Sequence, residues 1–267
     1  MTSAPSAGRL LVNRYALTEV IGNGPASVVW KAWDEELGSD VAVKEIQLRR
    51  GLDDLESAVV LKRVLREGRE AASFRHPGAV VVHDVFEESG GVFVVMELFT
   101  GPTLGERVTE RGPLPAEAAA GLAAQLLDTL EAAHAAGILH RAVSPGNVVW
   151  SDDGPALLSD FAVSGSLIPG RDPSLSPYCA PEQTPTTGAS PAADLWSLGA
   201  TLRFAVEGGD RVDGKQSAGT MQPLFDALLA DDPAARADVA TARRLLTQAA
   251  ATTEPAVEVT TPAPSAK

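Results

Sequence analysis

The sequence is poor in cysteine and in positive charge, and each shortage excludes a class of protein. Its 267 residues include one cysteine, Cys179, so a disulfide within the chain is impossible and a structural zinc site is not expected. Lysine and arginine together number 22 against 35 aspartates and glutamates, which gives a net charge of −13. Because phosphate contacts need clustered cations, we expect no nucleic acid partner.

Long apolar runs are also missing. No stretch reaches the roughly 18 apolar residues of a membrane-spanning helix, and the N-terminus lacks the basic segment and apolar core of a secretory signal. With the lone cysteine, these absences predict a cytoplasmic protein. The Pro/Thr-rich end, residues 251–267, is expected to be disordered. It leaves open whether the chain is complete or is the cytosolic part of a membrane protein.

The composition that remains is that of an ordinary globular protein, with 45% hydrophobic and 21% charged residues. β-branched apolar runs broken by Gly-rich or charged turns fill the first third, and helical periodicity dominates the rest. We therefore predict an α+β fold with two lobes, a small antiparallel β lobe with one main helix and a larger, mainly helical lobe. The expected boundaries are a disordered arm at 1–8, a folded domain at 9–250 (small lobe 9–98, large lobe 99–250) and the tail at 251–267. The expected strands span 15–21, 28–32, 41–46, 80–86 and 92–98, and the expected helices span 52–74, 104–136 (a short helix, then a long one), 190–206 and 221–248.

A glycine-rich turn that contains Gly22 and Gly24 lies between two strand-like segments. Glycines at such a turn let backbone N–H groups approach phosphates closely. A dinucleotide-binding fingerprint would need a helix after the glycines, and a strand follows here. Alone, the pattern favours a structural hairpin.

Lys44 ends the apolar run at 41–43. A lysine at the end of a buried strand is costly unless its charge is matched. Glu67, in the helical segment that follows, is the candidate partner, although a solvated helix face would also explain this residue. A glycine turn, a strand lysine and a helical glutamate in this order resemble the small lobe of a protein kinase, and the resemblance implies that the lysine contacts ATP phosphates.

The decisive stretch is HRAVSPGN at 140–147, which has the spacing of the protein kinase catalytic loop H-R-D-x-x-x-x-N. DFA at 160–162 stands where kinases have DFG. Ala142 replaces the aspartate of the loop, and no Asp or Glu lies within 140–147 to substitute for it. The loop and the DFA triplet therefore have the spacing of the kinase motifs, but the loop lacks the aspartate.

Three further segments complete the pattern. APE at 180–182 and DLWSLG at 194–199 match the end of the kinase activation segment and the buried-Asp helix, and Arg236 matches the arginine that pairs with Glu182. Taken together, the segments resemble the eukaryote-like Ser/Thr protein kinases of actinobacteria, over almost the whole chain. The resemblance implies a protein-kinase-like fold, with ATP and Mg²⁺ as cofactors.

By this resemblance, Lys44 would contact the ATP phosphates with Glu67 holding it, and Asn147 and Asp160 would be the Mg²⁺ ligands. The strand end at 96–99 would be the hinge, whose backbone bonds the adenine edge. Plain core packing would explain its apolar members equally well. The expected nucleotide-binding residues are Ile21, Gly22, Gly24, Val29, Ala42, Lys44, Glu67, Met96, Glu97, Phe99, Asn147, Val149 and Asp160.

Several departures from the family weaken the phosphate-transfer end. Ala142 cannot position or deprotonate a substrate hydroxyl, a role whose loss typically costs about 10²–10⁴ in rate. Ser144 replaces a lysine, and Pro25 at the tip of the glycine turn has no N–H to offer a phosphate. Ala162 replaces the DFG glycine, and no threonine lies between 160 and 182. We therefore expect no catalytic residue.

Three functions remain open. The retention of Lys44, Glu67, Asn147 and Asp160 favours a pseudokinase, a Mg–ATP-binding regulatory or scaffolding module with little or no phosphotransfer. A weakly active or atypical Ser/Thr kinase is the second, because much of kinase catalysis is positioning and electrostatics. A scaffold that binds no nucleotide is the third. A protein partner is expected, and nothing in the sequence specifies it.

Overall fold

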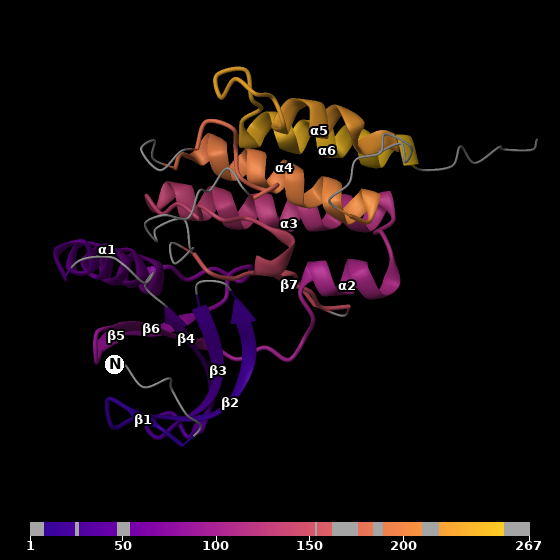
Figure 1. The fold of residues 1–267 in the computed structure, drawn as a ribbon. Coiled ribbons are helices and arrows are strands. Elements are labelled where there is room, and N and C mark those ends of the chain that lie inside the picture. Colours follow the sequence, from indigo (N-terminus) through magenta and orange to yellow (C-terminus); the bar gives the residue numbers. More distant parts are fainter. Residues whose placement is uncertain are drawn as a thin grey trace, which may run out of the picture.

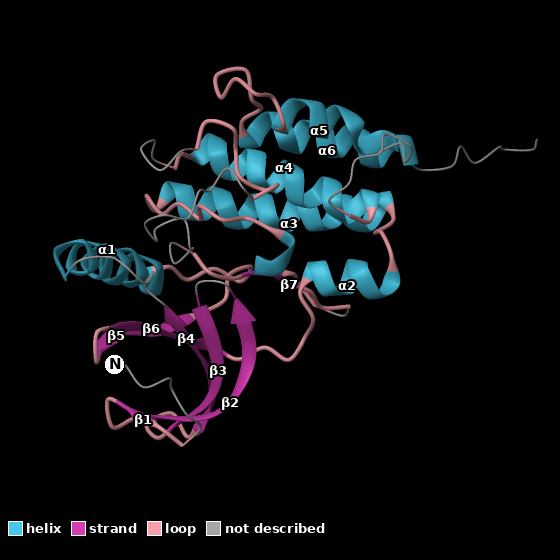
Figure 2. Ribbon diagram, viewed as in Figure 1, coloured by secondary structure: helices cyan, strands magenta, loops and turns pink. Residues whose placement is uncertain are grey.

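The computed structural model describes residues 8–24, 27–46, 54–152, 154–161, 176–183, 189–209 and 219–253. The arm up to residue 7, Pro25, Ala162 and the tail from 254 were subjects of predictions and lie outside the described residues. Within the described part, an antiparallel sheet with one helix forms a small lobe, and further helices form a larger lobe beside it (Figures 1 and 2). The predicted α+β, two-lobed arrangement is confirmed.

The sheet of the small lobe is antiparallel throughout and places Lys44. Residues of β3 and β4 alternate between two apolar clusters, so Trp30 and Val43 pack on one face of the sheet while Val29 and Ala42 pack on the other. Lys44 follows Val43 and shares the face of Ala42, as the period of two along a strand requires. The strands are β1 (Leu10–Leu11), β2 (Tyr15–Gly24), β3 (Ser27–Asp34), β4 (Ser39–Ile46), β5 (Val82–Glu88) and β6 (Gly91–Glu97), in the order β1-β2-β3-β4-β6-β5.

Helix α1 (Asp54–Ser73) lies between the sheet and the large lobe (Figure 1). It packs against β5 and β6, where Gly68 allows the closest approach, since a Cβ at this position would lie 2.9 Å from Val85 Cγ1. Ala71, one turn further on, belongs to the core of the large lobe. The single long helix of the small lobe therefore contacts both lobes.

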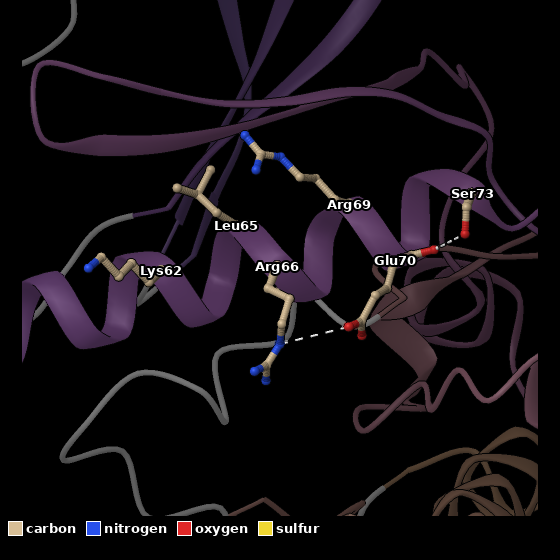
Figure 3. Close-up of a pocket in the computed structure, with 6 residues that line it drawn as sticks. All are labelled: Lys62, Leu65, Arg66, Arg69, Glu70 and Ser73. Atoms are coloured by element: carbon tan, nitrogen blue, oxygen red, sulfur yellow. Dashed lines mark hydrogen bonds and ion pairs between the residues drawn. The ribbon is translucent and has the colours of Figure 1, made fainter.

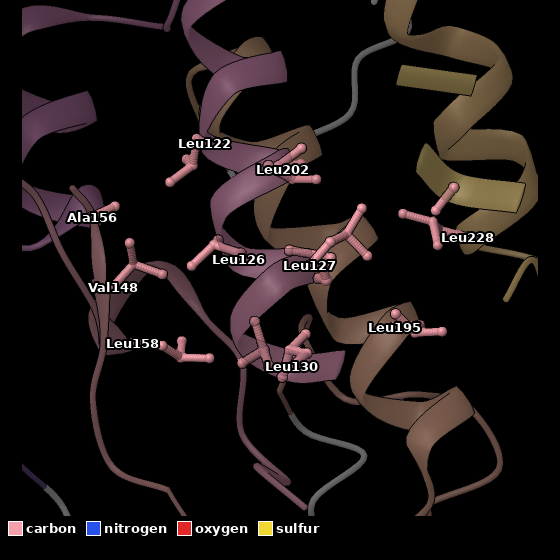
Figure 4. Close-up of a cluster of buried hydrophobic side chains, with 14 of the residues drawn as sticks. Leu122, Leu126, Leu127, Leu130, Val148, Ala156, Leu158, Leu195, Leu202 and Leu228 are labelled. Carbon is pink, nitrogen blue, oxygen red and sulfur yellow. The ribbon is translucent and has the colours of Figure 1, made fainter. Parts of the chain in front are cut away.

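The large lobe is built on α3 (Ala116–Ala135), whose leucines fill one buried cluster (Figure 4). The helix α2 before it begins with a capping box in which Thr103 and Glu106 satisfy each other's backbone N–H groups. The other elements are α2 (Leu104–Arg111), α4 (Pro191–Glu207), α5 (Gln222–Leu228), α6 (Val239–Thr253), short 3₁₀ turns at Pro145–Asn147 and Gly219–Met221, and the two-stranded pair β7 (Val148–Val149) and β8 (Leu157–Leu158).

One helix prediction needs correction. The helical segment expected over 221–248 is two helices, because α5 ends at Leu228 and α6 begins at Val239. Pro233 lies between them, and a proline supplies no N–H for a continuing helix. No helix in the described part of the chain is long and apolar enough to cross a membrane.

Candidate functional site

Asp194 of α4 binds the main chain of the predicted catalytic loop through hydrogen bonds. One carboxylate oxygen of Asp194 accepts the backbone N–H of Arg141 at 2.7 Å, and the other accepts that of His140 at 2.9 Å. His134 Nε2 also lies 2.8 Å from Asp194. Asp194 is 1% exposed, so the acid works as a buried anchor for the main chain of the loop.

His140 fixes the other side of the loop. Its Nδ1 accepts the backbone N–H of Ala142 at 3.2 Å, so Nε2 carries the proton and donates to the carbonyl of Ser159 at 2.8 Å. Burial lowers the pKa of His140, in keeping with a neutral ring. The ring meets Phe161 edge-on at 4.6 Å between centroids, which ties the loop to the residues around Asp160.

Ala142 lies in this loop where kinases carry the catalytic aspartate. Its carbonyl accepts a hydrogen bond from Asn147 Nδ2 at 2.8 Å. Asn147 is further fixed through its own carbonyl, which accepts the backbone N–H of Ser159 at 2.8 Å. The contacts of Ala142 with His140 and Asn147 use only its main-chain atoms, so these bonds do not depend on the side chain at position 142.

Lys44 and Asp160 form a direct ion pair across the two lobes. Lys44 Nζ lies 2.5 Å from Asp160 Oδ2, and the side chains are 12% and 16% exposed. Asp160 has a positive φ of 65°, which is uncommon for a residue other than glycine. Since Phe161 next to it is buried against His140 and Phe74, the unusual backbone angle is held by packing.

The predicted pairing of Lys44 with Glu67 is wrong in this structure. Glu67 is 1% exposed, and its Oε1 lies 2.5 Å from Arg141 Nη1 and accepts a hydrogen bond from Arg63 Nε at 3.1 Å. Guanidinium groups already neutralise Glu67, so Lys44 matches the charge of Asp160 instead. The second oxygen of Glu67, Oε2, is buried without a hydrogen-bond partner among the described residues.

Most of the apolar residues expected around an adenine ring come together. Val29, Ala42, Met96, Phe99 and Val149 belong to one cluster, contributed by β3, β4, β6, the segment after β6 and β7. An antiparallel bridge between Thr103 and Val149 brings the segment after the hinge against β7. Leu157 packs against the same cluster and was not anticipated.

Other predicted contacts lie at the margin of this cluster. Ile21 is 47% exposed and does not join it. Gly22 and Gly24 pair with Val29 and Ser27 at the hairpin end of β2, so the glycines lie over the same strand that supplies Val29. For Ile21, Gly22 and Gly24, a direct contact with nucleotide stays a prediction.

The hinge keeps a backbone donor available. Glu97 is exposed, and its N–H is used within the lobe by the carbonyl of Val81 at 2.9 Å. The N–H of Phe99 makes no hydrogen bond with any described residue. An adenine edge needs such an unused donor, and the contact expected of Phe99 with adenine stays a prediction.

The residues present fit a Mg²⁺-bound nucleotide. Asn147 donates through Nδ2, which leaves its amide oxygen as a ligand atom, and Asp160 adds a carboxylate. No group of three or more His, Cys, Asp or Glu side chains that could hold a metal occurs among the described residues. Two oxygen ligands suit Mg²⁺ when phosphates complete its coordination, as is usual for this ion.

The predicted pair of Glu182 and Arg236 is confirmed. Both carboxylate oxygens of Glu182 accept from Arg236, at 2.7 and 3.0 Å, and Arg236 also donates to the carbonyls of Ala192 and Ala230. Burial by itself would raise the pKa of Glu182, but the hydrogen bond and charge of Arg236 outweigh it and keep the pKa below its ordinary value. This bidentate pair fastens the APE segment to the large lobe.

Sequence reasoning missed the role of Arg141. The residue has a positive φ of 70°, and this conformation accompanies the turn of its side chain toward Glu67. Its position in the HRD-like triplet was visible, but the sequence gives no distance from which to choose among Arg63, Arg141 and Lys44 as the partner of Glu67.

Ser144 lines a groove of about 520 Å³ beside the loop. Its walls come from α2, the 3₁₀ turn at the end of the loop, the segment before APE and α4. A neutral serine therefore lines this groove at the position where kinases have a lysine.

Comparisons with known proteins agree with this geometry. The protein kinase domain model matches residues 15–245. The serine/threonine-protein kinase PknL of Mycobacterium bovis is 33% identical over 232 residues, which is 85% of this chain and 57% of the relative. PknA of Mycobacterium tuberculosis is 34% identical over 216 residues, 77% of this chain and 49% of the relative. The chain thus spans about half the length of the curated relatives it matches, and it belongs to the protein kinase domain family.

Proposed function

We propose that the chain is a nucleotide-binding pseudokinase, a module that holds Mg–ATP and transfers little or no phosphate. One observation carries the proposal: Lys44, Asp160 and Asn147 are gathered at one site, while the residue beside them in the loop is Ala142. Lys44 would orient the phosphates, Asn147 and Asp160 would bind Mg²⁺, and the apolar cluster would cover the adenine.

Bound Mg–ATP would bridge both lobes, since Lys44 belongs to the small lobe and Asp160 to the large one. Binding energy that depends on both lobes favours one relative arrangement of them. A protein partner, in the cytoplasm or at the cytosolic face of a membrane, would then bind that arrangement of the lobes more tightly than the other.

A nucleotide titration tests the proposal. We expect ATP with Mg²⁺ to raise the melting temperature of the wild type by a few degrees, because a ligand that binds only the folded state stabilises it by about 2.7 kcal/mol at a hundredfold excess over Kd. Lys44→Ala should remove most of this shift. Arg111→Ala, which removes an exposed cation far from the site, is the matched control and should keep it.

The same samples separate the two remaining functions. Radiolabelled phosphate transfer that disappears in Asp160→Asn would replace the proposal with a weakly active kinase. If the wild type shows no thermal shift at millimolar ATP, the proposal is rejected in favour of a scaffold that binds no nucleotide.

A further inference from the structure

The outer face of α1 carries an unusual set of charges for so acidic a chain. Lys62, Arg66 and Arg69 line a hollow of about 490 Å³ together with Leu65, Glu70 and Ser73. Figure 3 shows the three cations spaced along the helix, with Arg69 extending toward the strands drawn above it and Arg66 bending toward Glu70. We call this set of residues, 62, 65, 66, 69, 70 and 73, the α1 stripe.

Within the part of the chain that the structure describes, the cations of the α1 stripe have no acidic partner closer than 3.7 Å. Arg66 is 68% exposed and reaches Glu67 and Glu70 only at 3.7 Å, and Lys62 and Arg69 make no ion pair or hydrogen bond with any described residue. Nearly every other cation of the described part is held by a contact of 3.3 Å or less, as Arg14 is by Asp34 and Arg243 by Glu131. Arg244 on α6 is the exception outside the α1 stripe.

The shape of the α1 stripe limits what fits it. Positions 62, 66 and 69 follow one face of the helix over about 10 Å, at a rise of 1.5 Å per residue. Guanidinium groups match carboxylates in fork geometry. Apolar contact is offered by the outer part of Leu65, which is partly buried against the core of the small lobe, and by Val59, which lies three residues before Lys62 and is 59% exposed.

We propose that the α1 stripe is a docking surface for an acidic segment of a partner protein, in which apolar residues stand between carboxylates. The net charge of −13 opposes nucleic acids and anionic membranes, whose charge extends far beyond three contacts. A short acidic segment, in contrast, can contact the three cations of the stripe without placing negative charge against the rest of the acidic surface. This docking requires no nucleotide, so it goes beyond the function proposed above.

A labelled synthetic peptide of glutamates and leucines, titrated into the full chain by fluorescence anisotropy, tests this surface. At an ionic strength of about 0.15 M, the wild type should bind this peptide and not its glutamine analogue. The triple variant Lys62→Gln, Arg66→Gln, Arg69→Gln should lose about tenfold in affinity. The charge-matched triple variant Lys31→Gln, Arg111→Gln, Arg244→Gln should change it by less than about twofold.

Three results would overturn the docking surface. They are equal losses in the two triple variants, no binding by the wild type, and stripe-dependent binding of duplex DNA or anionic vesicles as tight as that of the peptide. Melting curves of both triple variants should stay close to that of the wild type, because five of the substituted residues are exposed and Lys31 is partly exposed. If the first variant is unfolded, Arg66→Glu alone should weaken peptide binding severalfold in a folded chain. Repeating the titration with ATP and Mg²⁺ separates this result from the fate of the nucleotide proposal.

Discussion

Position 142 holds alanine where the kinase catalytic loop has its aspartate. Asp194, His140 and Asn147 all bind main-chain atoms of the loop, so an aspartate introduced at 142 would enter a loop that already has its shape. The loss of the acid and the retention of the loop are therefore separate properties.

We expect Ala142→Asp with Ser144→Lys to switch on phosphotransfer. The gain should be on the order of 10²-fold or more over the wild type, since a positioned base is worth about 10²–10⁴. Stability should change by less than about 0.5 kcal/mol, as is usual for substitutions outside the core. A radiolabel assay beside urea unfolding measures both, with Ala142→Asn and Ser144→Lys as the control that lacks a base. An inactive but folded double variant would mean that other departures, such as Pro25, suffice to block transfer.

His140 makes stability depend on pH. Because burial lowers its pKa in the folded state, the unfolded chain takes up the proton more readily. The contribution is fully present above the unfolded pKa near 6.5 and is lost as the pH falls below it.

We expect the free energy of unfolding to fall by up to about 1.4 kcal/mol per pH unit below pH 6.5 from this histidine. Urea unfolding at pH 7.5, 6.5 and 5.5 gives the slope. His140→Gln should be less stable at pH 7.5 and should show a flatter dependence. A slope equal to that of the wild type would assign the proton uptake to another group.

At the scale of elements, the position of α1 decides where Glu67 lies. Gly68 follows Glu67 and brings the helix against β5, with no room for a Cβ beside Val85. Glycine is a poor helix former, so its presence in the middle of α1 indicates a packing requirement.

Gly68→Ala should destabilise the protein by about 1–3 kcal/mol, because an overpacked contact forces the helix away from the sheet. Gly121→Ala in α3 is the matched control: a Cβ there meets nothing within 4 Å, and we expect it to stabilise by up to about 1 kcal/mol. Thermal or urea unfolding compares them. Equal effects of the two variants would show that propensity, and not packing against Val85, governs position 68.

The elements also show how far the sequence could predict the site. Motif spacing predicted the Glu182–Arg236 pair, which the structure confirms, and it singled out Lys44 and Asp160, which the structure brings together. Each motif is local, and the family fixes their order. The partner of Glu67 was missed, since several cations compete for one buried carboxylate and their distances depend on how α1 packs. The break between α5 and α6 was missed because apolar periodicity outweighed Pro233.

At the scale of the whole molecule, two ion pairs between described residues join the lobes. Lys44 meets Asp160, and Glu67 of α1 meets Arg141 of the loop. A buried charge that loses its partner costs more than a pair that is removed together. The interface between the lobes should therefore respond very differently to single and to paired substitutions.

Lys44→Met should lower the free energy of unfolding by about 1–3 kcal/mol, and adding Asp160→Asn should recover most of that loss. A double-mutant cycle by urea unfolding without nucleotide measures the coupling. The exposed pair Arg111 and Asp152 is the comparison, for which about 0.5 kcal/mol or less is expected. Additive effects at Lys44 and Asp160 would mean that this ion pair does not stabilise the lobe interface.

The main-chain anchoring of the catalytic loop has a consequence for how such a protein evolves. Natural selection for a stable fold acts on Asp194, His140 and Asn147 but hardly on the side chain at 142. A chain of this family can therefore gain or lose its acid by one substitution without first passing through a misfolded ancestor.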